Sequence, residues 1–190
     1  VAVSHTAYMI EPYNDKDTYG TTLLPPEVVK KWVVQADKNS FRVRLHACGD
    51  GAVRLALDCY EEARKENGYR DIRHTIEHLE TVHPDDFDRL ETLNVIASIQ
   101  PEHMAMTEQF KENPFPSLLG KKREPYFWPN KSFRKSNALV AFGSDFPVVE
   151  LNPLLGVFRA VTREHNDGMP ENGWNPQEKV SMAEALKSYT

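Results

Sequence analysis

The sequence has few of the features that mark a disulfide-rich or membrane protein. Only two of its 190 residues are cysteines, Cys48 and Cys59, too few for a disulfide framework, so we expect reduced thiols and a cytoplasmic location. No run of about 18 apolar residues is present, and the N-terminus lacks the basic-then-apolar order of a signal peptide. We therefore expect no membrane span and no membrane partner.

Strong charge of one sign is also missing. The chain has 23 Lys and Arg against 28 Asp and Glu, a net charge of −5, with the two signs interspersed. Such a surface does not suit a phosphate backbone, so no nucleic-acid partner is expected. The 40% of hydrophobic residues is typical of a globular protein, and length alone favours one domain over residues 1–190.

Strand and helix patterns alternate along the chain. Strand patterns are predicted at 41–47, 73–79, 95–100 and 139–146. Helical spacing is predicted around and between them, at 26–39, 50–67, 84–93, 126–137, 153–164 and 181–190. This alternation predicts parallel strands with crossover helices, an α/β fold, and leaves open whether the sheet is doubly wound or closed into a barrel.

Two segments lack a clear period and are predicted to be loops. The first 20 residues show neither helical nor strand spacing, and residues 101–125 are polar and interrupted by prolines. The second segment is longer than an ordinary connection, so we expect a functional loop there. Three histidines outside the strands, His5, His83 and His165, are expected on the solvated surface.

Potential metal ligands lie at the ends of three predicted strands. His46 closes the first strand, His78 the second and Asp145 the fourth. The carboxyl ends of parallel strands meet on one face, and two imidazoles with one carboxylate suit Zn²⁺ or a similar divalent ion. A single histidine at a strand end is more often a hydrogen-bonded structural residue. The shared placement of the three is what favours a metal site.

Three further residues have competing interpretations. His103 begins the segment after the third strand, where it could contact a substrate or be an exposed loop residue. His74 shares a face with His78 if the strand alternates, but lies about 13 Å behind it at ~3.3 Å per residue, so we expect it in the core. Cys48 is interpreted as a small buried residue rather than as a nucleophile. No G-x-S-x-G motif is present, which argues against a serine α/β-hydrolase.

A family resemblance is carried by several short motifs in a fixed order. They are His46-Ala47-Cys48-Gly49-Asp50, then Arg73-His74 and Ile76-Glu77-His78, then Ala97-Ser98-Ile99-Gln100-Pro101 with His103, then Gly143-Ser144-Asp145-Phe146-Pro147. With these motifs the chain resembles the amidohydrolase superfamily. The similar group within it is that of the metal-dependent hydrolases that include N-substituted formamide deformylase and exoenzyme regulators.

The resemblance implies a (β/α)₈ barrel of which this chain is the C-terminal part, about strands five to eight, so that residues 1–190 form a single partial barrel domain. It implies that His46 and His78 are metal ligands and that Asp145 binds metal and shuttles protons. We expect His103 to hold the substrate or its developing oxyanion. The family's first-strand His-x-His and fourth-strand lysine have no counterpart in this chain. We therefore expect the chain to be inactive alone and to form homo-oligomers, or to pair through exposed barrel edges.

The implied activity is metal-dependent hydrolysis of C–N bonds, other than peptide bonds, in a small molecule. The implied cofactor is a divalent metal, Zn²⁺ by preference, as one or two ions. The alternative is a non-catalytic binding or regulatory protein on the same barrel. One residue departs from the pattern: alternation places Arg44 on the face of His46, where it needs a carboxylate partner or would disrupt the site.

Overall fold

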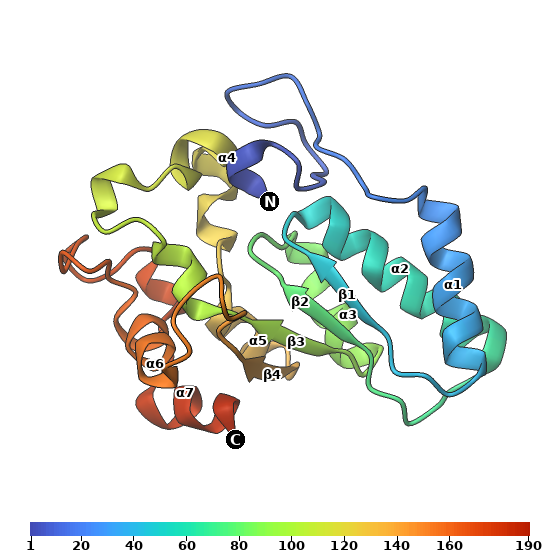
Figure 1. The fold of residues 1–190 in the computed structure, drawn as a ribbon. Coiled ribbons are helices and arrows are strands. Elements are labelled where there is room, and N and C mark those ends of the chain that lie inside the picture. Colours follow the sequence, from blue (N-terminus) through green and yellow to red (C-terminus); the bar gives the residue numbers. More distant parts are fainter.

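The computed structural model describes all of residues 1–190 and contains one sheet of four parallel strands (Figure 1). The strands are β1 (Arg44–Ala47), β2 (Thr75–His78), β3 (Ile96–Ile99) and β4 (Leu139–Phe142). They lie side by side in the order β1-β2-β3-β4, so each crossover leads to the adjacent strand. The prediction of an α/β fold with parallel strands is confirmed.

Helices fill the connections between the strands. The α-helices are α1 (Pro26–Lys38), α2 (Asp50–Asn67), α3 (Phe87–Thr92), α4 (Phe115–Arg123), α5 (Asn130–Lys135), α6 (Pro153–Thr162) and α7 (Met182–Tyr189). Short 3₁₀ helices are η1 (Ala2–Ser4), η2 (Pro84–Asp86), η3 (Pro101–Ala105), η4 (Phe110–Glu112), η5 (Glu124–Tyr126) and η6 (Pro176–Glu178). None of the helices combines the length and the apolar character that a bilayer crossing requires.

Local signals set the ends of the best-predicted helices. Pro26 occupies the first turn of α1, and Gly68, with φ of 77°, ends α2 where the sequence predicted. At α7 the predicted capping box is present. Ser181 Oγ accepts a hydrogen bond from the Glu184 amide, and the Glu184 carboxylate accepts one from the Ser181 amide at 2.7 Å.

Three predicted segments differ from the structure. Residues 101–125 are not a structureless loop, because they contain η3, η4, α4 and the start of η5. The helix predicted at 126–137 begins only at Asn130, directly after Pro129, which can precede a helix but not continue one. The last strand ends at Phe142, so Asp145 lies beyond the strand rather than within it.

The two faces of the sheet have different environments. On β1, Leu45 and Ala47 face the helices, and Leu45 lines an apolar cavity together with side chains of α1 and α2. Arg44 and His46 point to the opposite face, which no helix covers and where both are exposed. One covered and one open face is consistent with a segment of a barrel wall.

Arg44 has the carboxylate partner that its position requires. Its Nε lies 3.0 Å from Glu77 Oε1, and its side chain is 70% exposed. Because its guanidinium is mostly in solvent, Arg44 itself has little desolvation cost. Arg44 therefore does not disrupt the neighbouring His46.

The N-terminal residues form an ordered cover over the carboxyl edge of the sheet, with η1 beside α4 (Figure 1). The Ile10 amide donates to Asp50 Oδ1 at 2.9 Å, and the Ala52 amide donates to the Tyr8 carbonyl at 3.0 Å. These bonds attach the segment to the first turn of α2.

Of the histidines expected at the surface, His165 is placed differently. It is 1% exposed, with Nδ1 3.2 Å from the Thr107 carbonyl and its ring against Phe110. His165 therefore anchors the segment after α6 to the segment after β3.

Candidate metal centre

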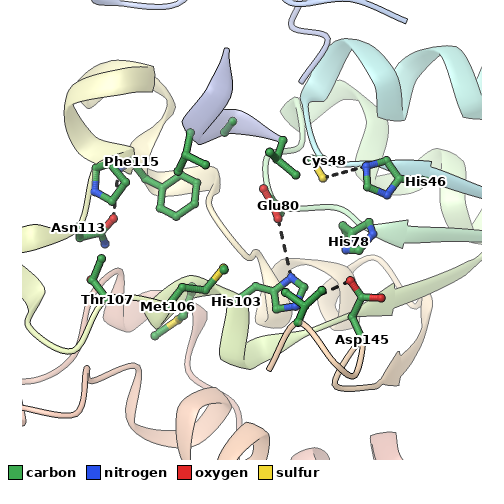
Figure 2. A pocket seen from close by; sticks show the side chains of 16 residues that line it. His46, Cys48, His78, Glu80, His103, Met106, Thr107, Asn113, Phe115 and Asp145 are labelled. Carbon is green, nitrogen blue, oxygen red and sulfur yellow. Dashed lines mark hydrogen bonds and ion pairs between the residues drawn. The ribbon is translucent and has the colours of Figure 1, made fainter. Parts of the chain in front are cut away.

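Four side chains singled out from the sequence line one cavity at the carboxyl ends of the strands (Figure 2). His46 lies on β1, His78 ends β2, His103 belongs to η3 directly after β3, and Asp145 follows β4. They come together because parallel strands present their carboxyl ends at the same edge. The cavity encloses about 750 Å³, part of which is open to solvent.

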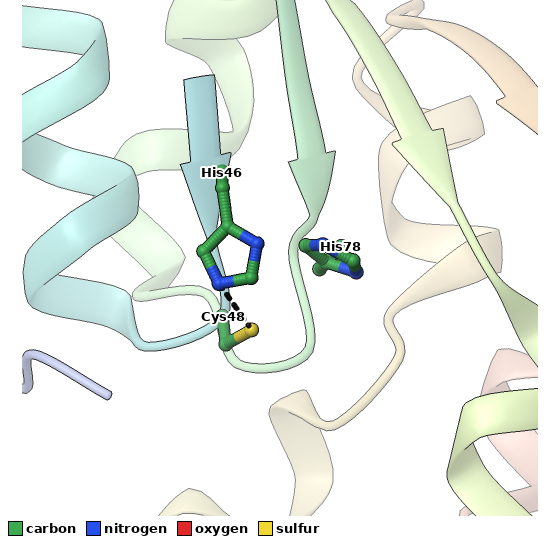
Figure 3. Close-up of side chains that lie close together, drawn as sticks. All are labelled: His46, Cys48 and His78. Carbon is green, nitrogen blue, oxygen red and sulfur yellow. Dashed lines mark hydrogen bonds between the residues drawn. The ribbon is translucent and has the colours of Figure 1, made fainter. Parts of the chain in front are cut away.

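The backbone at the end of β2 decides where His78 points. The strand register pairs Ala47 with His78, so strict alternation would turn His78 toward the helices, together with Ala47. Instead His78 has φ of 80° and the next residue, Leu79, has φ of 48°. The His78 ring lies 4.3 Å from the His46 ring, between centroids (Figure 3). Left-handed backbone at non-glycine residues is strained and persists where the surroundings impose it.

His74, four residues before His78, lies in the core as expected. Its Nε2 is 3.2 Å from Asp37 Oδ1, its Nδ1 accepts from the Val43 amide, and its ring stacks on Tyr60. The expectation that His74 and His78 share a face is wrong, because the left-handed residue at the strand end breaks the alternation.

The potential ligand atoms form two groups that share His78. One contains His78, His103 and Asp145, and the other contains His46, Cys48 and His78. Within each group, one ligand atom from every residue lies within 4.8 Å of the others. The predicted ligands His46 and Asp145 thus line the same cavity but fall in different groups, with His78 between them.

Two imidazole nitrogens in this cluster are buried without a hydrogen-bond partner, His78 Nδ1 and His103 Nε2. His103 Nε2 is 4.0 Å from Asp145 Oδ2, beyond hydrogen-bond distance. An unsatisfied buried polar atom costs about 1–3 kcal/mol, so native proteins seldom keep one without a ligand or water. Imidazole nitrogens with a nearby carboxylate fit a divalent cation.

Burial keeps these imidazoles in the form that binds metal. Desolvation, reinforced by His46 nearby, lowers the pKa of His78 to about 4. Desolvation also lowers the pKa of His46 and of His103. A neutral imidazole has the free lone pair that coordination requires.

Comparison with known proteins identifies the family of this chain. The sequence profile of the amidohydrolase family matches residues 1–190. The chain belongs to the amidohydrolase family. It is 34% identical to the protein LONG AFTER FAR-RED 3 of Arabidopsis thaliana over 98% of this chain and 31% of that protein. It is 26% identical to N-substituted formamide deformylase of Arthrobacter pascens over 92% of this chain and 31% of that protein.

A solved amidohydrolase-type structure has the same fold. A metal-dependent hydrolase from Pyrococcus horikoshii superposes on 100% of this chain with a TM-score of 0.85 and 26% identity, over 37% of its own length. The chain thus spans about a third of the length of each of these relatives. This coverage agrees with a part of an amidohydrolase barrel.

Sequence reasoning missed one acidic residue of this candidate site. Glu80 is 7% exposed, and its Oε1 lies 4.0 Å from His103 Nδ1 (Figure 2). Desolvation raises the pKa of Glu80 to about 7. Its spacing of two residues from His78 was the available signal, but the predicted strand ended at residue 79.

Cys48 is buried, as the sequence suggested, and it lies next to the imidazole of His46. Its Sγ lies 3.4 Å from His46 Nε2, and the side chain is 4% exposed at the cavity wall. Desolvation raises the pKa of the thiol above its usual range. The cavity is also lined by the apolar side chains of Met104, Met106, Phe115 and Val148.

Proposed function

We propose that the whole protein to which this amidohydrolase chain belongs hydrolyses C–N bonds of the amide type, other than peptide bonds, in a small molecule. This proposal rests on one observation. His46, His78, His103 and Asp145 converge in one cavity, where two buried imidazole nitrogens have no hydrogen-bond partner. The matched relative named N-substituted formamide deformylase supports the choice of bond.

His46, His78 and Asp145 would hold the metal, and Zn²⁺ suits this set of nitrogen and oxygen donors as one or two ions. When bound, a divalent ion lowers the pKa of a coordinated water from about 15.7 to about 7 and polarises the scissile carbonyl. Because the pKa values of His46 and His78 are lowered, these two ligands would be neutral and ready for the ion at neutral pH.

Asp145 is placed to move the proton. Its side chain is 43% exposed and faces the cavity, so it can accept a proton from the attacking water and deliver it to the leaving nitrogen. His103, in its Nε2-protonated tautomer, would donate from the buried Nε2 to the carbonyl oxygen as negative charge develops. Asp145 would thus transfer the proton, and His103 would stabilise the negative charge on the carbonyl oxygen.

The apolar wall of the cavity supports a substrate that carries an apolar substituent. Met106 and Phe115 would contact this group while the amide lies over the histidines. The substrate is therefore a small molecule rather than a nucleic acid or a membrane.

The edges of the sheet support a proposal about assembly. β1 and β4 each have a neighbour on one side only. We propose that further strands of the whole protein, or a second copy, pair with them. Residues 1–190 alone would bind metal weakly and would not turn over substrate. A clean monomer by light scattering, or measurable hydrolysis by the isolated chain, would contradict this.

The test uses the whole protein with a panel of N-substituted formamides and other small amides. We expect about one or two zinc ions per protein by elemental analysis and metal-dependent hydrolysis. His78→Ala should lose both, whereas His83→Ala, at a half-exposed position outside the cavity, should keep both. Full activity of His78→Ala would refute the proposal.

A non-catalytic regulatory protein is the second candidate. It is favoured by the 34% identity to LONG AFTER FAR-RED 3, whose name states no hydrolase activity. A whole protein that binds no metal and hydrolyses none of the amides would support this candidate over the enzyme.

A further inference from the structure

The loop after β1 brings a thiol to the candidate metal centre (Figure 3). Cys48 Sγ lies 3.4 Å from His46 Nε2, and the ligand atoms of His46, Cys48 and His78 all lie within 4.8 Å of one another. From this juxtaposition we propose that Cys48 is a direct metal ligand and makes the site selective for thiophilic divalent ions such as Zn²⁺ and Cd²⁺. The inference rests on the proposed metal-dependent function and adds a ligand to it.

The distance between the two donor atoms fits a shared ion. Zn–S bonds are about 2.3 Å and Zn–N bonds about 2.0–2.1 Å, which at a tetrahedral angle places sulfur and nitrogen about 3.5 Å apart. Cys48 Sγ and His46 Nε2 are 3.4 Å apart, so they could bind one ion almost without moving. The third donor, from His78, lies within 4.8 Å of both, a gap that a side-chain rotation can close.

The surroundings of the thiol differ from those of an ordinary core cysteine. Cys48 lines the cavity together with His46, His78 and Glu80, although it also borders a second, mainly apolar cavity. His78 is 7% exposed, and its Nδ1 has no hydrogen-bond partner. The cluster therefore holds a buried donor atom that no protein group satisfies. Cys59, which is fully buried in α2, belongs to neither ligand group.

The loop that carries Cys48 is held from two sides. The Thr81 amide donates to the Cys48 carbonyl at 3.0 Å. On the other side, a Cβ on Gly49 would lie 2.2 Å from the Tyr8 carbonyl oxygen and 2.6 Å from Met9 Sδ, so only glycine fits. A ligand on a loop fixed in this way is preorganised for coordination.

Coordination by Cys48 balances as an exchange of a proton for a metal ion. The S–H bond breaks, its proton passes to solvent, and the sulfur lone pair forms the bond to the ion. Thiolate ligands favour Zn²⁺ over Mg²⁺ or Mn²⁺, which prefer oxygen. The thiol therefore gives the site a metal preference that histidine and aspartate alone would not.

The test is X-ray absorption at the zinc edge on the zinc-loaded whole protein. We expect one sulfur at about 2.3 Å in addition to nitrogen and oxygen at about 2.0–2.1 Å. The sulfur should be lost in Cys48→Ala and retained in the matched variant Cys59→Ala. In a chelator competition, Cys48→Ala should bind zinc at least about 10-fold more weakly.

The outcomes separate this inference from the proposed function. Zinc bound by nitrogen and oxygen alone in the wild-type protein would overturn the role of Cys48 and leave the hydrolase proposal intact. Absence of zinc from the wild-type protein would overturn both. Should Cys48→Ala fail to fold, a cobalt(II) titration of the wild-type protein decides. A near-ultraviolet sulfur-to-cobalt charge-transfer band supports the inference, and its absence refutes it.

Discussion

Replacement of His103 by alanine separates transition-state stabilisation from metal binding. His103 belongs to one of the two potential ligand groups, yet its buried Nε2 has no partner and is 4.0 Å from Asp145 Oδ2. In the proposed mechanism this nitrogen donates to the developing oxyanion. Loss of one such donor costs about 2.7–4 kcal/mol of transition-state stabilisation, so kcat should fall about 10²-fold to 10³-fold.

The effect on stability should be small by comparison. His103 is 4% exposed, and its ring stacks on His78 with centroids 5.8 Å apart. Since no hydrogen bond is lost at Nε2, the cost is that of a small cavity, about 2 kcal/mol. The variant of the whole protein should therefore fold and can be assayed.

Three measurements together test this prediction: steady-state kinetics, zinc content by elemental analysis, and thermal unfolding. We expect His103→Ala to keep its zinc while kcat falls, and His83→Ala to behave as the wild type. An unchanged kcat would refute the reasoning. Loss of zinc would refute it in another way, by showing that His103 is a ligand.

Three further predictions concern stability. The guanidinium of Arg163, which is fully buried, donates to three backbone carbonyls, so Arg163→Met should lower the free energy of unfolding by about 3 kcal/mol or more in urea titrations. Ser181→Ala removes the side-chain bond to the Glu184 amide and should cost about 1 kcal/mol, measured in the same way. Burial lowers the pKa of His74, whose Nδ1 accepts from the Val43 amide. Because the unfolded chain then binds the proton more readily, stability should fall as pH drops below about 6.5, and less so in His74→Gln.

Each of these predictions has a control. Arg42→Met replaces an exposed arginine and should leave the free energy of unfolding unchanged. The wild-type slope of stability against pH is the reference for His74→Gln. An Arg163→Met or Ser181→Ala protein as stable as the wild type would contradict the hydrogen-bond argument. A His74→Gln protein with the full acid sensitivity would place the titrating group elsewhere.

Helices were the most predictable part of the fold, because their signals are local. Helix α2 occupies 50–67 as predicted, since an apolar stripe and the Asn67-Gly68 ending are both read from adjacent residues. Segment 101–125 was missed because its 3₁₀ turns are too short to show a period. Its one α-helix, α4, is interrupted at Gly120, where φ is 73°.

The site was predictable as a place but not as a geometry. Strand ends with His46, His78 and Asp145 indicated the correct edge of the sheet, since parallel strands must share it. The pattern could not show that His78 leaves the alternation, because backbone torsion is not encoded in polarity. The approach of Cys48 to His46 depends on the course of one turn, which only the three-dimensional structure gives.

The backbone is left-handed at His78 and at Asp145, with φ of 80° and 60°, and this conformation affects which residues can replace them during evolution of the family. Each such residue costs on the order of 1 kcal/mol, which selection tolerates while the side chain serves the active site. A descendant that abandoned metal chemistry would gain stability by drifting to glycine or asparagine at either position. Glycine or asparagine at one of these two positions would therefore distinguish family members that have lost metal-dependent activity from those that retain it.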